Sequence, residues 1–180
     1  MAGFEQLGEL VVHTGPVFRV SIGQVRAPSG QVLTREYVRH PGAVVVVPVI
    51  GDDAVLVRQY RAVIDKHLLE LPAGKRDVPG EEPALAAARE LREEVGLEAK
   101  SLELLSSFYN TPGFSDEYSY LYLGTDCVEV PNDRQGVEEE HMTMERVPLS
   151  AVPALIADGT IDDAKSIIGL LLARQVLGVA

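Results

Sequence analysis

The sequence predicts an α/β protein, a layered α/β/α sandwich with a mixed sheet, joined to a small N-terminal antiparallel β unit. Ala43–Ile50 is a nearly continuous run of β-branched residues, which is typical of a strand covered on both faces. Helical patterns follow at Ala84–Arg92 and Asp163–Leu177, with further strand patterns between them. Strands interleaved with helices favour layers built around one sheet.

The first forty residues form the small β unit in this interpretation. Three short strands are expected, at Leu10–His13, Val17–Val25 and Val32–Val38. The apolar content is modest, so the unit should pack on the main domain or on a second copy of the protein. His40-Pro41-Gly42 marks a boundary, which predicts an N-terminal unit over residues 1–41 and a core domain over 42–180.

The core domain should continue with more strands and two closing helices. The expected strands are Ala43–Ile50, Ala54–Tyr60, His67–Leu71, Ser101–Tyr109, Tyr118–Leu123 and Met142–Val147. The closing helices are Ala151–Ala157, with Ser150 as a candidate N-cap, and Asp163–Leu177.

Composition narrows the class of protein. A chain of 180 residues with 46% hydrophobic residues can bury one sizeable core. The net charge of −11 argues against binding to nucleic acid or to an anionic membrane. Cys127 is the only cysteine, and the acidic start of the chain does not resemble a signal peptide. We therefore expect a soluble, cytoplasmic protein.

The most informative segment is Gly74–Leu97, a loop followed by an acidic helix. Glu90, Glu93 and Glu94 are three and four residues apart, so their carboxylates crowd one face of the helix. Carboxylates at this spacing repel one another, and a hard divalent cation such as Mg²⁺ would relieve the repulsion. The alternative is an ordinary solvated helix rich in glutamate.

Local signals support the loop and the helix. Pro79-Gly80 indicates a turn, Pro83 suits the first helical turn and Gly96 is a natural C-terminal stop. The apolar spacing predicts a core-facing stripe, made of Leu85, Ala88, Leu91 and Val95. Arg89 and Glu93 can form an i, i+4 ion pair.

This segment resembles the signature of the Nudix hydrolases, G-x5-E-x7-R-E-U-x-E-E-x-G-U with U aliphatic. The matching positions are Glu81, Arg89, Glu90, Leu91, Glu93, Glu94, Gly96 and Leu97. Gly74 departs from the pattern, because it stands seven residues before Glu81 instead of six.

The resemblance implies a divalent-metal hydrolase acting on a nucleoside diphosphate joined to another group. It implies two or three Mg²⁺ or Mn²⁺ ions. Glu90 and Glu94 are the first candidates for their ligands and Glu93 is the third, with the backbone carbonyl of Ala73 as a further ligand. Arg89 would hold the glutamates in place. Glu81 would either join the metal cluster or favour the N-terminus of the helix through its dipole.

Features outside the signature resemble the ADP-ribose pyrophosphatase branch of the family. They are the strings Thr34–Glu36, Leu56–Arg61 and Leu69–Gly74, together with Pro112, fifteen residues beyond Leu97, within Thr111–Glu117. The residues that this resemblance places near the substrate are Arg35, Arg58, Arg61, Glu70, Pro112, Phe114 and Ser115. Each also has an ordinary structural explanation, such as a turn at Pro112 or a surface charge at Arg58.

In that branch the general base comes from an acidic loop after the later strands. The segment of this chain that resembles that loop is Val137–His141. Glu139 is the candidate base, with Glu138 and Glu140 as alternatives. The predicted reaction is hydrolysis of ADP-ribose to AMP and ribose 5-phosphate.

Two other functions remain open at the level of sequence. The same chemistry could act on GDP-mannose, NADH or FAD, and a non-catalytic ADP-ribose sensor is a further alternative. The resemblance also implies a homodimer that exchanges the N-terminal region.

Overall fold

The computed structural model describes residues 3–131 and 140–179, and the chain folds as two compact units. The first, called here the N-terminal unit, comprises the residues up to Gly42 together with Phe108–Ser119. The second, the core unit, comprises Ala43–Ser107 and the residues from Tyr120 onward. Within the described ranges, no helix has both the length and the apolar character needed to cross a bilayer.

Three antiparallel strands form the sheet of the N-terminal unit, in the order β1-β2-β3. They are β1 (Glu5–Thr14), β2 (Arg19–Arg26) and β3 (Val32–Arg39). The separate antiparallel unit expected from the sequence is therefore confirmed. β1 begins five residues earlier than predicted, because its polar start pairs in register with the end of β2, where Arg26 lies 2.6 Å from Glu5.

A second sheet, most of whose residues belong to the core unit, contains seven strands among the described residues. They are β4 (Ala43–Ile50), β5 (Asp53–Arg61), β6 (Lys66–Glu70), β7 (Ala73–Lys75), β9 (Ser101–Tyr109), β10 (Tyr118–Thr125) and β12 (Thr143–Pro148). Five of them follow the order β12-β5-β4-β10-β9, while β6 pairs with β5 and β7 pairs with β4. A separate short pair consists of β8 (Leu97–Glu98) and β11 (Val128–Glu129).

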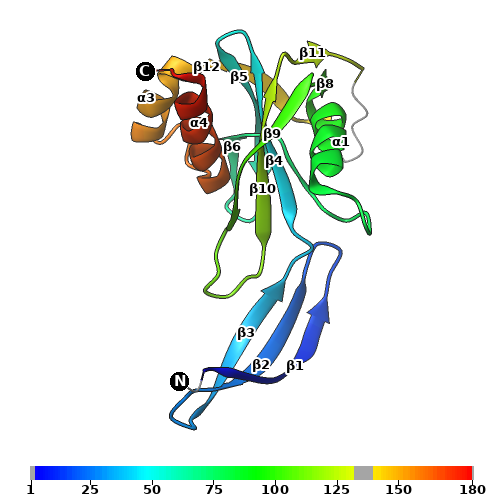
Figure 1. Ribbon diagram of the computed structural model, residues 1–180, viewed down its shortest axis with the longest axis vertical. Helices are drawn as coiled ribbons and strands as arrows, with labels where there is room; N and C mark the ends of the chain where they lie inside the picture. Colours follow the sequence, from blue (N-terminus) through cyan, green and yellow to red (C-terminus); the bar gives the residue numbers. More distant parts are fainter. Residues whose placement is uncertain (1–2, 132–139, 180) are drawn as a thin grey trace. The chain divides into compact units, whose positions relative to one another are not determined.

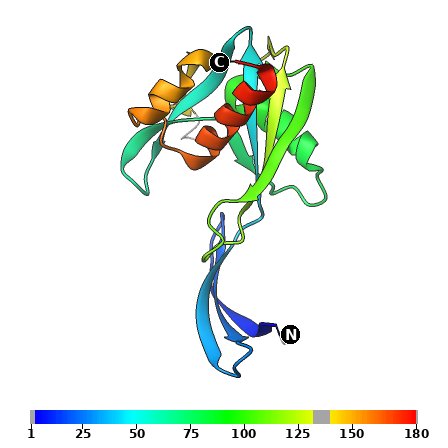
Figure 2. The same ribbon diagram turned by 60° about the vertical axis from the view of Figure 1, so that its left-hand side comes forward.

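Helices cover the two faces of this sheet. α1 (Pro83–Val95) lies on one face, and α3 (Val152–Ala157) and α4 (Ala164–Leu177) lie on the other (Figures 1 and 2). The predicted α/β/α sandwich with a mixed sheet is confirmed.

The double coverage explains why β4 is apolar throughout. Val44 and Val46 pack with Leu91 and other residues of α1 in one buried cluster. On the opposite face, Val47 approaches Gly169 of α4, where an added Cβ would lie 3.1 Å from Val47 Cγ2 and 2.6 Å from Leu71 Cδ1. Glycine at this position therefore allows α4 to approach the sheet closely.

One predicted cap is wrong. The N-cap of α3 is Ala151, and Ser150 lies within the 3₁₀ helix η1 (Leu149–Ala151) that leads into α3. Helices commonly begin with such a tighter turn, whose backbone bonds leave Ser150 no capping role.

Candidate active site

α1 is the element that carries the predicted acidic residues. It begins with Pro83 and ends at Gly96, which adopts a left-handed conformation with φ of 60°, as the sequence predicts. The predicted core-facing stripe is wrong for its first half. Leu85 is 63% exposed and Ala88 is also exposed, because the helix buries its alanines at positions 86 and 87 instead.

This orientation of α1 turns part of the acidic face toward the sheet. Glu94 is buried, with 7% of its surface exposed, alongside the apolar Leu91 and Val95. Its Oε2 accepts a hydrogen bond of 3.0 Å from the backbone N–H of Ala73, the first residue of β7. Glu94 is therefore hydrogen-bonded to Ala73, the residue whose backbone carbonyl is the expected metal ligand.

Gly74 lies against Glu90 in the same arrangement. A Cβ added to Gly74 would overlap the carboxyl carbon and both carboxyl oxygens of Glu90. Any side chain at position 74 would therefore displace this carboxylate. The contact gives Gly74 a structural role even though its spacing from Glu81 departs from the signature.

Arg89 binds three carboxylates at once. Its Nε and Nη2 each donate to Glu81 at 3.1 Å, and its Nη1 donates to Glu90 at 2.8 Å and to Glu93 at 3.0 Å. The predicted ion pair between Arg89 and Glu93 is confirmed. Hydrogen bonds from Arg89 lower the pKa of Glu81, and its carboxylate partners raise the pKa of Arg89. Glu81 therefore pairs with Arg89. It lies before α1, whose first turn contains no acidic residue.

The charges around Arg89 favour an additional cation. The single positive charge of Arg89 is shared by the carboxylates of Glu81, Glu90 and Glu93. The buried Glu94 adds a further carboxylate on the same helix. Burial raises the pKa of Glu90, and the nearby Glu93 adds to this effect against the opposing pull of Arg89. A half-buried carboxylate with a raised pKa is under-compensated, so a divalent cation would stabilise its charged form.

The donor set fits Mg²⁺ or Mn²⁺ in its chemistry. Carboxylate and backbone carbonyl oxygens are the hard ligands that these ions prefer, and Glu90, Glu94 and Ala73 supply them side by side. Over residues 3–131 and 140–179, no three acidic, histidine or cysteine side chains converge on one point. The carboxylates instead turn to Arg89 and to the backbone of Ala73.

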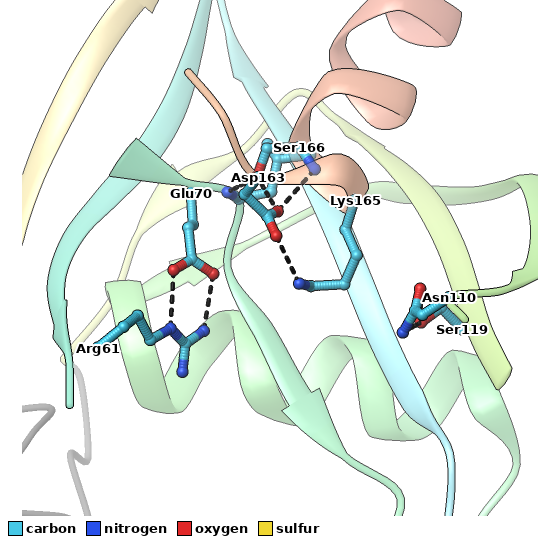
Figure 3. A network of polar contacts seen from close by, with 8 residues as sticks. Arg61, Glu70, Asn110, Ser119, Asp163, Lys165 and Ser166 are labelled. Atoms are coloured by element: carbon cyan, nitrogen blue, oxygen red, sulfur yellow. Dashed lines mark hydrogen bonds and ion pairs between the residues drawn. The ribbon is translucent and has the colours of Figure 1, made fainter. Parts of the chain in front are cut away.

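Two predicted substrate-binding residues of the core unit are paired with each other. Arg61, at the end of β5, donates from Nε and Nη2 to the two oxygens of Glu70, both at 2.7 Å (Figure 3). Glu70 is 1% exposed, so this bidentate pair satisfies a carboxylate that would otherwise be costly to bury. Arg58 donates instead to Glu145 of β12, at 2.5 Å from Nε.

The other predicted substrate-binding residues lie in the N-terminal unit. Arg35 is exposed and donates to the carbonyl of Thr34 at 2.8 Å, and Pro112 and Phe114 are exposed. Ser115 is buried next to Val38 of β3, whose N–H donates to the carbonyl of Phe114 at 2.8 Å. The loop of residues 111–117 is thus fixed to β3 by backbone hydrogen bonds.

The predicted base, Glu139, and its alternative Glu138 lie outside the described residues. Glu140 and His141 are described and exposed, just before β12.

Comparisons with known proteins bear on the family of the chain. The family model described as the NUDIX domain matches residues 39–168, which include α1 and β7. The chain is 41% identical to an ADP-ribose pyrophosphatase of Mycobacterium tuberculosis over 174 residues, covering 96% of this chain and 84% of that protein. It is 35% identical to an ADP-ribose pyrophosphatase of Bacillus subtilis, covering 86% of this chain and 84% of that protein.

The fold has a similar counterpart among solved structures. The crystal structure of an ADP compounds hydrolase matches with a TM-score of 0.85 and 26% sequence identity, covering 99% of this chain and 96% of that chain. The matched model, the two relatives and the acidic helix set against Ala73 and Gly74 lead to one conclusion. The chain belongs to the Nudix family.

Proposed function

We propose that the protein is a metal-dependent ADP-ribose pyrophosphatase that hydrolyses ADP-ribose to AMP and ribose 5-phosphate. The observation that carries the proposal is the placement of Glu90 and Glu94 against the backbone of Gly74 and Ala73, where one guanidinium serves several carboxylates. The relatives described as ADP-ribose pyrophosphatases support the choice of substrate.

The residues that would hold the metal are the carboxylates of Glu90, Glu93 and Glu94 and the carbonyl of Ala73. Two or three Mg²⁺ or Mn²⁺ ions would neutralise the diphosphate oxygens and lower the pKa of a bound water. Arg89 holds the carboxylates in position through its hydrogen bonds to Glu90 and Glu93. Substrate contacts are assigned to the predicted residues, Arg35, Arg58, Arg61, Glu70, Pro112, Phe114 and Ser115.

We assign proton abstraction to Glu139. The water oxygen forms a bond to one phosphorus while the bond from that phosphorus to the bridging oxygen breaks. The bridging oxygen leaves with the electron pair on the second phosphate, and Glu139 accepts the proton of the water. The acidic run Glu138–Glu140 supports this choice by placing three carboxylates next to one another in the sequence.

Product analysis tests the proposed activity. Incubation with ADP-ribose and Mg²⁺ should yield equal amounts of AMP and ribose 5-phosphate, and addition of EDTA should abolish both. The Glu139→Gln substitution should lower kcat by about 10²-fold or more, with little change in KM. Binding of ADP-ribose without any product would indicate a sensor. Preference for GDP-mannose, NADH or FAD would reassign the substrate.

The proposal includes a homodimer formed through the N-terminal unit. This unit exposes large apolar side chains, with Phe4 70% exposed and Leu10 69% exposed. Other exposed apolar side chains of its three strands and turns are Leu7, Val11, Val12, Val17, Phe18, Ile22 and Val32. Exposed apolar side chains gathered on one small unit support an interface there.

Light scattering after gel filtration tests the dimer. The expected mass is twice the chain mass of 19.5 kDa. Leu10→Asp should shift the protein toward the monomer, because it places a charge in the apolar interface. A wild-type protein that remains monomeric at micromolar concentration would contradict this part of the proposal.

The proposed location is the cytoplasm, where the buried thiol of Cys127 would remain reduced. Cell fractionation would test this, and recovery outside the cytoplasmic fraction would contradict it.

A further inference from the structure

The short segment Glu70–Ala73 positions the backbone of the candidate metal site. It connects β6 to β7, and Pro72 within it has no N–H to donate to a neighbouring strand. The Ala73 N–H holds Glu94 at 3.0 Å, and the carbonyl of the same residue is the proposed backbone ligand. A shift of this segment would therefore move two parts of the metal site together.

A side chain of α4 holds this segment. The backbone N–H of Leu71 donates to Oγ of Ser166 at 2.8 Å. Leu71 is 1% exposed and Ser166 is fully buried, so water is not available to replace this acceptor. On the other side, the Val46 N–H donates to the carbonyl of Pro72 at 3.0 Å.

Asp163 fixes the direction of the Ser166 hydroxyl. The hydroxyl has one proton, and Oγ lies 2.7 Å from Asp163 Oδ2, which can only accept while the carboxylate is ionised. The proton therefore points to Asp163, and a lone pair of Oγ remains for the Leu71 N–H. Lys165 keeps the carboxylate charged, donating from Nζ to Asp163 Oδ1 at 2.7 Å.

This arrangement does more than cap α4. Capping requires only that Asp163 accept from the backbone N–H of Ser166, which it does at 2.9 Å. The contact between Ser166 and Leu71 joins the first turn of α4 to a segment 95 residues earlier in the chain. An acceptor with a fixed direction at that point restricts how the segment can move.

We propose that Ser166, oriented by Asp163, is a positioning residue of the metal site that holds the Leu71–Ala73 backbone where Ala73 meets Glu94. The inference rests on the proposed function, because it concerns the metal site of the proposed enzyme. Ser166 acts through the backbone and does not itself contact the metal or the substrate.

The test is the affinity for Mn²⁺ without substrate, followed by electron paramagnetic resonance of the free ion. Ser166→Ala leaves the Leu71 N–H without its acceptor and should weaken Mn²⁺ binding by about 10-fold or more. In assays, the Mg²⁺ concentration for half-maximal activity should rise by about the same factor, while KM for ADP-ribose at saturating Mg²⁺ stays unchanged. Ser166→Thr, which keeps a hydroxyl, should retain Mn²⁺ affinity close to that of the wild type.

A destabilised control separates positioning from loss of stability. Leu170 is fully buried on the same helix, and Leu170→Ala should lower Tm at least as far as Ser166→Ala does. It leaves the hydroxyl of Ser166 in place, so Mn²⁺ affinity should remain at the wild-type level. If Ser166→Ala does not fold, Ser166→Cys carries the same expectation, because a thiol of similar size is a weak acceptor.

Two outcomes would overturn the inference alone: unchanged Mn²⁺ affinity in Ser166→Ala, or an equal loss in Leu170→Ala. Absence of Mn²⁺ binding in the wild type would instead overturn the proposed function, and the inference with it.

Discussion

Replacing Glu94 by glutamine is expected to lower kcat for ADP-ribose on the order of 10³-fold while the protein stays folded. The glutamine oxygen can still accept the hydrogen bond from the Ala73 N–H, so the local structure should survive. The substitution removes the negative charge with which Glu94 would bind the metal, and this loss should lower kcat. In EDTA, Tm should be unchanged or higher, because the substitution removes a charge from a site that is 7% exposed.

The matched control is Glu103→Gln, which makes the same chemical change at an exposed position of β9. Its kcat and Tm should equal those of the wild type. Steady-state kinetics with saturating Mg²⁺ and ADP-ribose give the comparison. A Glu94→Gln enzyme with near wild-type kcat would remove Glu94 from the metal site.

The second large effect is expected from Gly74→Ala. The new methyl group would overlap the Glu90 carboxylate, so either β7 or Glu90 must move. Displacement of a catalytic group by about 1 Å can cost about 10²-fold in rate, and we expect a loss of that order in kcat/KM. Mn²⁺ affinity should fall as well, because the substitution moves a proposed ligand.

Gly3→Ala is the control for this substitution, because an added Cβ at Gly3 meets no atom within 4 Å. Kinetics and Mn²⁺ binding should be unchanged in Gly3→Ala. The double variant Gly74→Ala with Glu90→Asp adds a second test, since the shorter side chain relieves the overlap. Full activity of Gly74→Ala would show that the Glu90 carboxylate does not occupy this position during turnover.

The sequence predicted the layers of the core well, because burial on both faces leaves a direct mark. β4 is apolar along its length, and its alternating residues meet α1 on one side and α4 on the other. The helix limits at Pro83 and Gly96 were equally readable, since both residues act through local backbone geometry.

The buried face of α1 was harder to predict, and the reason lies in the site. Apolar spacing alone placed Leu85 and Ala88 in the core, together with Leu91 and Val95. The helix instead rotates to bury Glu94 against Ala73 and leaves Leu85 63% exposed. Sequence patterns are expected to fail where a functional site overrides the usual burial of side chains.

Contacts between distant segments could not be read from one sequence. Ser166 fits the first turn of a capped helix, and nothing in its neighbourhood indicates a bond to Leu71. The same holds for Arg61 and Glu70, which were assigned separately to the substrate and meet as a pair in the structure. Such contacts depend on the register of packed elements, which local propensities do not determine.

The central claim is that divalent ions occupy the acidic cluster of α1 and bind a diphosphate there. Isothermal titration calorimetry with Mn²⁺, in the presence and absence of a non-hydrolysable ADP-ribose analogue, tests it most directly. We predict saturable Mn²⁺ uptake that tightens with the analogue and is lost in the Glu90→Gln/Glu94→Gln variant. Absence of uptake by the wild-type protein under both conditions would contradict the account.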